Sequence, residues 1–207
     1  MTLEPLFHAA YPDELMAMVS LIFPKVEEAD LRLISAPLDF LGINYYSRAV
    51  IAHSAGFPMM DYTQIKPPDS SYSQMWEIYP DGLYSLLKRV HNDYHPSSII
   101  ITENGIPVAD AVDADDKVRD NRRIQYLQDH LLATHRALDE GVPVDGYCVW
   151  SLLDNFEWAL GYQMRYGLIY VDFNNQKRTI KNSAFWYTKV MANNGFTQQT
   201  IFFDYRP

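Results

Sequence analysis

A glutamate at the end of a short apolar run is the first residue of this chain that could do chemistry. Residues 99–102, Ile-Ile-Ile-Thr, are β-formers too uniformly apolar to alternate, and Glu103 follows them directly before Asn-Gly. This pattern predicts a buried strand that ends in a turn. A carboxylate at the carboxyl end of a buried parallel strand is held rigidly and still meets a ligand. Glu103 is therefore a candidate working residue, the alternative from this stretch alone being a turn-capping or ion-paired glutamate.

Aromatic and acidic residues crowd together after another apolar run. Residues 149–158 read Val-Trp-Ser-Leu-Leu-Asp-Asn-Phe-Glu-Trp, and residues 161–167 read Gly-Tyr-Gln-Met-Arg-Tyr-Gly. Flat aromatic faces pack against the C–H face of a sugar, while carboxylates and indole N–H groups bind its hydroxyls. The mixture suits a carbohydrate pocket. The alternative is an aromatic core corner in which Arg165 pairs with Asp154 or Glu157.

Elements that could position these residues alternate along the chain. Besides the run before Glu103, residues 38–46 and 144–153 are expected to form buried strands. Apolar residues at helical spacing predict a helix from Pro80 to the His95-Pro96 pair, and another over residues 121–140. This order predicts an α/β fold with parallel strands and right-handed crossovers.

The remaining segments are expected to lie at the surface. Residues 6–33 predict a surface helix that starts near Pro12 and Asp13 and is broken at Pro24. Residues 47–73 are interpreted as a strand fragment with a long loop, and residues 108–120 as an acidic, solvated loop. No internal repeat or low-complexity segment occurs.

The composition and net charge limit the kinds of molecule that this chain is expected to bind. The chain has 207 residues and a net charge of −9 with no basic block, which disfavours nucleic acid and anionic membranes. Its single cysteine, Cys148, excludes an internal disulfide framework, and its six histidines are not spaced as a ligand set, so no metal is expected. No apolar run spans a bilayer and residues 1–13 lack signal-peptide features, which favours a cytoplasmic protein.

The motifs together resemble glycoside hydrolase family 1, the β-glucosidases. The resemblance rests on Thr-Glu-Asn-Gly at residues 102–105, on residues 39–46 before it and on residues 150–158 after it. Supporting blocks are residues 76–83, 161–168 and 181–187, in the family's order. The resemblance implies a (β/α)8 TIM barrel, of which residues 1–207 would be the carboxyl-terminal part of a single domain, holding about the last three units, strands six to eight.

The resemblance also implies roles for individual residues in a retaining double displacement on β-glycosides, a reaction that needs no cofactor. Glu103 would be the nucleophile, and Tyr46 would donate a hydrogen bond to its carboxylate. The residues expected to bind the substrate are Trp150, Glu157, Trp158, Trp76, Tyr166 and Asn44. An acid at Glu157 would repel a phosphate, so an unphosphorylated sugar is expected. Tyr166 replaces the phenylalanine that is more usual in the family. The sequence therefore does not decide whether the preferred sugar is glucose, galactose or fucose.

One part of the family's machinery has no counterpart in this sequence. Retaining hydrolysis needs a second carboxyl group about 5 Å from the first, and the family carries it in an Asn-Glu-Pro block that does not occur here. Leu3-Glu4-Pro5 is only superficially similar, because it matches the connection before strand six. The first five strands are also absent, so we expect the missing amino-terminal part of the barrel, or self-association, to cover the sheet edges. The chain alone would be a poor catalyst.

Three hypotheses follow from the sequence. The chain is a piece of a β-glucosidase that works with its missing part, a non-catalytic sugar-binding remnant, or an assembly module that uses its strand edges. Retention of both Glu103 and Tyr46 favours the first, because a pure binder has no need of an oriented nucleophile.

Overall fold

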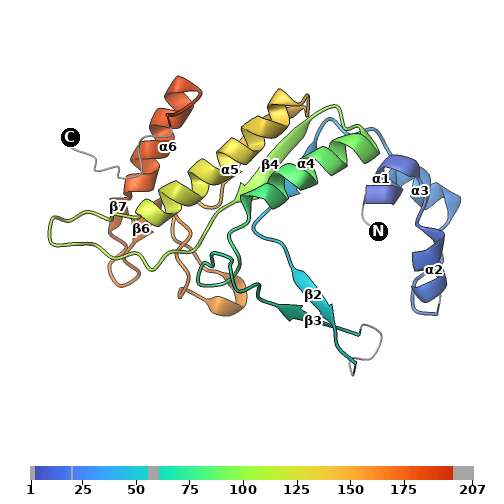
Figure 1. The fold of residues 1–207 in the computed structure, drawn as a ribbon, viewed down its shortest axis with the longest axis horizontal. Helices are drawn as coiled ribbons and strands as arrows, with labels where there is room; N and C mark the ends of the chain where they lie inside the picture. Colours follow the sequence, from blue (N-terminus) through green and yellow to red (C-terminus); the bar gives the residue numbers. More distant parts are fainter. Residues whose placement is uncertain (1–2, 20, 56–60, 198–207) are drawn as a thin grey trace.

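The computed structural model describes residues 3–19, 21–55 and 61–197. Three parallel strands form its central sheet in the order β1-β4-β5, with bounds β1 (Leu41–Asn44), β4 (Ile99–Asn104) and β5 (Val144–Val149) (Figure 1). All three lie where the sequence predicts buried strands. The strand expected over residues 144–153 ends earlier, at Val149, because the chain beyond β5 leaves the sheet and Leu153 forms a bridge with Ile169 instead.

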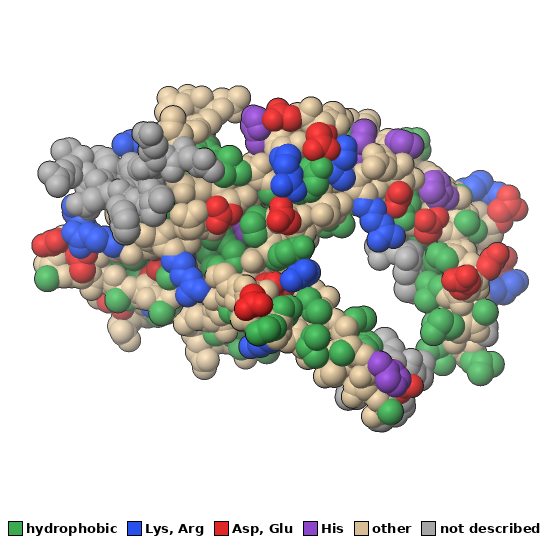
Figure 2. Space-filling model, viewed as in Figure 1, with side chains coloured by type: hydrophobic (Ala, Val, Ile, Leu, Met, Phe, Trp, Pro, Cys, Tyr) green, Lys and Arg blue, Asp and Glu red, His purple; other side chains and the backbone are tan. Residues whose placement is uncertain are grey.

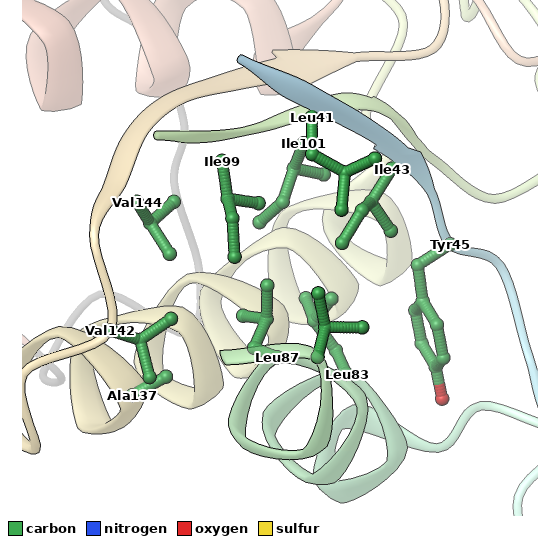
Figure 3. Packing of buried hydrophobic residues seen from close by; sticks show 11 residues of the cluster. Leu41, Ile43, Tyr45, Leu83, Leu87, Ile99, Ile101, Ala137, Val142 and Val144 are labelled. Carbon is green, nitrogen blue, oxygen red and sulfur yellow. The ribbon is translucent and has the colours of Figure 1, made fainter. Parts of the chain in front are cut away.

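Two long helices, α4 (Pro80–Tyr94) and α5 (Asn121–Asp139), pack on one face of this sheet. Pro80 suits the first turn of α4, and His95 ends it in the left-handed conformation just before Pro96. Figure 3 shows Leu83 and Leu87 of α4 directed at Ile99 of β4. These three side chains are fully buried. The apolar spacing of the sequence therefore marks the face of α4 that covers the strands.

The other elements surround this unit. Helices α1 (Leu3–His8), α2 (Asp13–Val19) and α3 (Glu28–Ile34) precede β1, and α6 (Asn182–Asn193) packs on α5. Two hairpins are formed by β2 (Val50–His53) with β3 (Tyr62–Ile65) and by β6 (Ile169–Val171) with β7 (Arg178–Ile180), and η1 (Trp158–Leu160) is a short 3-10 helix. The surface helix predicted to start at Asp13 and to end before Pro24 is confirmed by α2, whereas the connecting segments around it also contain the short helices α1 and α3. Part of the predicted loop, residues 56–60, lies outside the described residues.

Within the described residues, the opposite face and both edges of the sheet are open. Strands β1 and β5 each pair there with one neighbouring strand. Asn44, Thr102 and Cys148 on the strands are exposed, as is Phe40 just before β1. Figure 2 shows further hydrophobic side chains along the β2–β3 hairpin, where Ile51 is 58% exposed. A closed barrel would bury such surfaces, so the sheet has the form of three consecutive units of a larger barrel.

The expectation of a solvated loop over residues 108–120 is wrong at both ends of the segment. The side chains of Asp110 and Asp120 are almost completely buried, and both are paired with the buried Arg123 of α5. Charge pairing offsets the cost of removing these carboxylates from water, which sequence polarity alone does not reveal. Only the middle of the segment is solvated, as at Asp115 and Asp116. No helix among the described residues is long and apolar enough to cross a membrane.

A buried histidine behind the sheet gives an expected pH dependence. His130 of α5 is fully buried and stacks on Tyr126, and burial lowers its pKa to about 4. The unfolded chain, with an ordinary histidine pKa of about 6.5, binds the proton first. The free energy of unfolding should therefore fall by up to about 3 kcal/mol as the pH drops from 6.5 to 4. Urea unfolding at a series of pH values measures this.

Two variants separate the contribution of His130 to this fall in the free energy of unfolding from that of the other titrating groups. His130→Gln should remove most of that decline between pH 6.5 and 4. His135→Gln, on the exposed side of the same helix, should retain it because that side chain is 70% exposed. An equal decline in both variants would contradict the assignment.

Candidate active site

A bulge in β4 turns Glu103 toward the open side of the sheet. Ile43 of β1 pairs with Ile101, but the next residue, Asn44, pairs with Glu103, so Thr102 is an extra residue in β4. Regular alternation would place Glu103 on the same buried face as Ile101. With the bulge, Thr102 is exposed, Glu103 is half-buried, and the following asparagine returns to the buried face. Bulges commonly redirect a side chain next to an active site.

The carboxylate of Glu103 is held by a tyrosine from the neighbouring strand end. The Tyr46 hydroxyl donates to Glu103 Oε2 at 2.6 Å. Burial, and then the hydrogen bond to Glu103, raise the pKa of Tyr46 far above its usual value. Tyr46 therefore remains a hydrogen-bond donor to this carboxylate across the physiological range.

An aromatic wall lies beside this pair. The ring centroids of Trp76 and Tyr46 are 5.1 Å apart, and those of Trp76 and Tyr166 are 6.0 Å apart. Burial, and then the nearby Glu157, raise the pKa of Tyr166, and its hydroxyl donates to the sulfur of Met75 at 3.3 Å. The hydroxyl that distinguishes Tyr166 from phenylalanine is thus engaged by the protein. The planes of Trp76 and Tyr46 are inclined by 57° and those of Trp76 and Tyr166 by 37°, so the wall offers separate ring faces, each suited to one side of a sugar or of its aglycone.

Polar contacts fix Trp76 in this wall. The Ser73 hydroxyl oxygen accepts from the Trp76 backbone N–H at 2.9 Å, forming a tight turn. The next residue, Glu77, is buried and makes a bidentate pair with Arg48, with N···O distances of 2.8 and 2.9 Å. The sequence reasoning did not identify Arg48 or Glu77, because their partnership joins two loops and has no local signature. The indole Nε1 of Trp76 is buried and has no hydrogen-bond partner among the described residues.

Trp150 follows β5 and packs closely on the turn after Glu103. Its backbone N–H donates to the Asn104 carbonyl at 2.9 Å. A Cβ at Gly105 would lie 2.0 Å from the Trp150 carbonyl oxygen, well inside van der Waals contact. Glycine is therefore required there by the approach of the Trp150 backbone.

Gly105→Ala should lower the free energy of unfolding by about 1–3 kcal/mol, because the backbone of Trp150 must move. Gly195→Ala serves as the control, since the nearest atom to its added Cβ would be 3.9 Å away. Its effect should stay within about 0.5 kcal/mol. Urea unfolding measures both variants, and equal effects would show that the contact at Gly105 is relaxed in solution.

The loop after Trp150 is anchored by a buried carboxylate. Asp154 accepts from Arg165 at 2.6 Å, from Lys181 at 2.8 Å and from the Gly167 backbone N–H at 2.9 Å. The Arg165–Asp154 pair is the one that the aromatic-corner alternative proposed. Asp154 lies three residues before Glu157, so the segment that leads to Glu157 starts from a fixed position.

Glu157 and Trp158 lie beyond that anchor and differ in environment. Glu157 is half-buried, and its Oε2 atom is buried without a hydrogen-bond partner in the described part of the chain. Trp158 is 80% exposed. An unpaired buried carboxylate oxygen is costly unless a ligand donates to it, so Glu157 is suited to bind a hydroxyl group.

The predicted site residues fall into two groups. The first group forms a continuous set of contacts: Tyr46 is hydrogen-bonded to Glu103, and its ring contacts those of Trp76 and Tyr166. Asn44 belongs to this group because it pairs with Glu103 in the sheet, and its side-chain oxygen accepts from the Thr102 hydroxyl at 2.7 Å. The other group, Trp150, Glu157 and Trp158, comes from the loop after β5, and Glu157 joins it to the first, because in addition to burial it is close enough to Tyr46 and Tyr166 to raise the pKa of both hydroxyls. No group of three or more metal-ligating side chains occurs in the described ranges.

A tyrosine-held carboxylate and an aromatic wall lie at the carboxyl end of three α/β-barrel units, which places the chain in the class of α/β-barrel proteins. The sequence model of Glycosyl hydrolase family 1 matches residues 1–196. The chain is 42% identical over 196 residues to the 1,4-beta-D-glucan glucohydrolase of Thermotoga neapolitana, covering 94% of this chain and 44% of that protein. Beta-glucosidase A of Thermotoga maritima is 40% identical over 194 residues, covering 93% and 43%. The chain belongs to glycosyl hydrolase family 1.

Solved structures agree with this assignment. The family 1 β-glucosidase from Thermotoga maritima superposes with a TM-score of 0.90 at 40% identity, covering 95% of this chain and 44% of that chain. The same enzyme in complex with castanospermine gives a TM-score of 0.88. The expected family and partial barrel are thus confirmed. The 207 residues span less than half the length of these relatives.

Proposed function

We propose that this chain is the nucleophile-bearing part of a retaining β-glucosidase. The observation that carries the proposal is the 2.6 Å hydrogen bond from Tyr46 to Glu103, at the open end of a strand and beside an aromatic wall. A glutamate with a purely structural role would need only a hydrogen-bond or ion-pair partner. A nucleophile also needs one carboxylate oxygen left free to attack the substrate, and the Tyr46 hydroxyl contacts only the Oε2 atom of Glu103.

In the proposed reaction Glu103 attacks the anomeric carbon of a β-glucoside. The glycosidic bond breaks as the bond to the carboxylate forms, and the leaving oxygen takes a proton from a second carboxyl group. Water, activated by that same group, then releases the sugar from Glu103 with net retention. The second group is proposed to lie in the barrel strands beyond these 207 residues, because no Asn-Glu-Pro block occurs among them.

The proposed ligand is an unphosphorylated β-glucoside. Trp150 and Trp158 supply ring faces, and Glu157 Oε2 and the Trp76 N–H supply an unpaired acceptor and donor for hydroxyl groups. The negative charge of Glu157 disfavours a 6-phosphorylated sugar. The relatives named beta-glucosidase support glucose as the sugar.

The proposed partner is the rest of the barrel. Strands β1 and β5 present free edges, and hydrophobic side chains such as Phe40 and Ile51 are 48% and 58% exposed. Further polypeptide that adds parallel strands to both edges would cover these surfaces. It would also bring the second carboxyl group to the carboxyl end of the strands, next to Glu103.

The test is complementation. The chain is mixed with the amino-terminal segment of Thermotoga maritima beta-glucosidase A that precedes the matched region, assembly is followed by size-exclusion chromatography, and release of p-nitrophenol from its β-glucoside is measured. We expect negligible turnover by either piece alone and at least 100-fold faster turnover by the complex, since general acid–base catalysis contributes about that much. An assembled but inactive complex would contradict the hydrolase proposal, and full activity of the chain alone would contradict the need for a partner.

A further inference from the structure

The buried asparagine after the candidate nucleophile is bonded in three directions. Asn104 is fully buried, and its Nδ2 donates to the Tyr45 carbonyl at 2.7 Å and to the Tyr126 hydroxyl at 3.0 Å. Its Oδ1 accepts from the hydroxyl of Tyr147 on β5. One side chain thus ties the end of β4 to the chain after β1, to β5 and to helix α5.

These bonds lie where the sheet loses its regular ladder. The pairing of β4 with β1 shifts between Ile43 and Asn44, and its pairing with β5 shifts between Ile101 and Asn104. The bulge shifts the register, and just beyond it the Tyr45 N–H donates to the Glu103 carbonyl and the Trp150 N–H donates to the Asn104 carbonyl. The side-chain bonds of Asn104 add to these backbone bonds and hold the bulged segment on both sides.

Tyr126 contacts the residue after Glu103 and the backbone of Tyr46. Its ring is 1% exposed and is stacked on His130 within α5, with ring centroids 3.9 Å apart. Its hydroxyl accepts from Asn104 Nδ2 and donates toward the Tyr46 carbonyl at 3.4 Å. The residue after Glu103 and the backbone of Tyr46 are therefore attached to one rigid phenol.

We propose that Tyr126 is a positioning residue that, with Asn104, sets the distance between the Tyr46 hydroxyl and the Glu103 carboxylate. This inference rests on the proposed role of Glu103 as the nucleophile. Without the phenol, Asn104 loses the acceptor for one N–H and Tyr46 loses the contact to its carbonyl, so the bulged segment can move relative to Tyr46. Displacements of about 1 Å in a reacting group cost up to about 100-fold in rate.

The experiment measures covalent labelling of the chain by a 2-deoxy-2-fluoroglucoside with a dinitrophenolate leaving group. Tyr126→Phe keeps the stacked ring and removes only the hydroxyl. We expect its maximal labelling rate to fall about tenfold, with less than a twofold change in the half-saturating concentration. Tyr187→Phe is the matched control, because that hydroxyl also contacts β5, donating to the Tyr147 carbonyl at 3.0 Å, but does not reach Asn104. It should change the rate by less than about twofold.

Amide hydrogen exchange provides a readout independent of labelling. The Tyr45 and Trp150 N–H groups donate to the carbonyls of Glu103 and Asn104, both at 2.9 Å. Exchange at these two amides should accelerate at least about fivefold in Tyr126→Phe, which corresponds to losing about one hydrogen bond. The Leu41 amide, which donates to Ser98 at the other end of the same strands, is the internal reference and should not change.

The outcomes separate this inference from the proposed function. Labelling that survives in Glu103→Gln, or that never occurs in a parent chain that still binds the sugar, refutes the nucleophile assignment, and the exchange data still decide whether Tyr126 orders the strand end. A Tyr126→Phe variant with the parent's exchange at Tyr45 and Trp150 overturns the positioning role. So does a variant that is less stable but, while folded, labels at the parent's rate.

Discussion

Glu103→Gln in the complemented barrel is expected to lower kcat for p-nitrophenyl β-glucoside by at least about 1,000-fold, the scale seen when a nucleophile is removed. The amide is nearly the same size and still accepts the Tyr46 hydrogen bond, but it carries no charge with which to attack the anomeric carbon. Steady-state kinetics on the parent and variant complexes measure the effect.

A second glutamate of the same site is the matched control. Glu157→Gln should mainly weaken binding, lowering kcat/KM by about 10- to 100-fold, the cost of a charge-assisted hydrogen bond. Equal losses of kcat in both variants would contradict separate roles for Glu103 and Glu157.

A small anion can distinguish a lost nucleophile from a damaged fold. Glu103→Ala leaves space below the anomeric carbon, so formate can attack in place of the carboxylate and restore departure of the activated leaving group. Its product should be the α-glucosyl formate, because only one displacement occurs. Rescue that yields a β product would contradict an attack from the side of Glu103.

Lys181→Met is expected to lower the free energy of unfolding by about 3–5 kcal/mol, the cost of breaking a buried ion pair. The Lys181 side chain is fully buried and its ammonium pairs with Asp110 and Asp154, whose side chains are also buried. Methionine has a similar shape but leaves both carboxylates without this cation. Urea unfolding of the chain measures the loss.

Lys177→Met is the matched control for this change. Lys177 also forms an ion pair, with Asp116, but the two side chains are 58% and 66% exposed. Water and salt screen that pair, so the cost should be below about 1 kcal/mol. Similar losses in the two variants would show that the buried cluster adds no more stability than a surface pair.

The strands and the main helices could be predicted because their signals are local. Ile99 and Ile101 form a continuous apolar run, Leu83 and Leu87 recur at helical spacing, and Pro80 and Pro96 bracket α4. Each signal reflects burial or backbone restriction that the residue carries with it. The position of Glu103 at a strand end follows from the same local evidence.

Features that depend on pairing between distant segments could not be predicted. The bulge at Thr102 is set by the register between two strands that are distant in sequence, because Ile43 pairs with Ile101 whereas Asn44 pairs with Glu103. The burial of Asp110 depends on Arg123 and Lys181 meeting it in space. Polarity alone predicts a solvated segment there, and only the three-dimensional charge pairing reverses that expectation.

The most direct test of the central claim is the intact mass of the purified chain after incubation with a 2-deoxy-2-fluoroglucoside that carries a dinitrophenolate leaving group. Fluorine slows release of the glycosyl-enzyme, and the activated leaving group departs without a proton, so the second carboxyl group is not needed. A mass increase of one fluoroglucosyl group, located on Glu103 by peptide mapping and lost in Glu103→Gln, is the predicted result. A label on another residue, or an unmodified mass while sugar binding is still detected by titration, would contradict the assignment of Glu103 as the nucleophile.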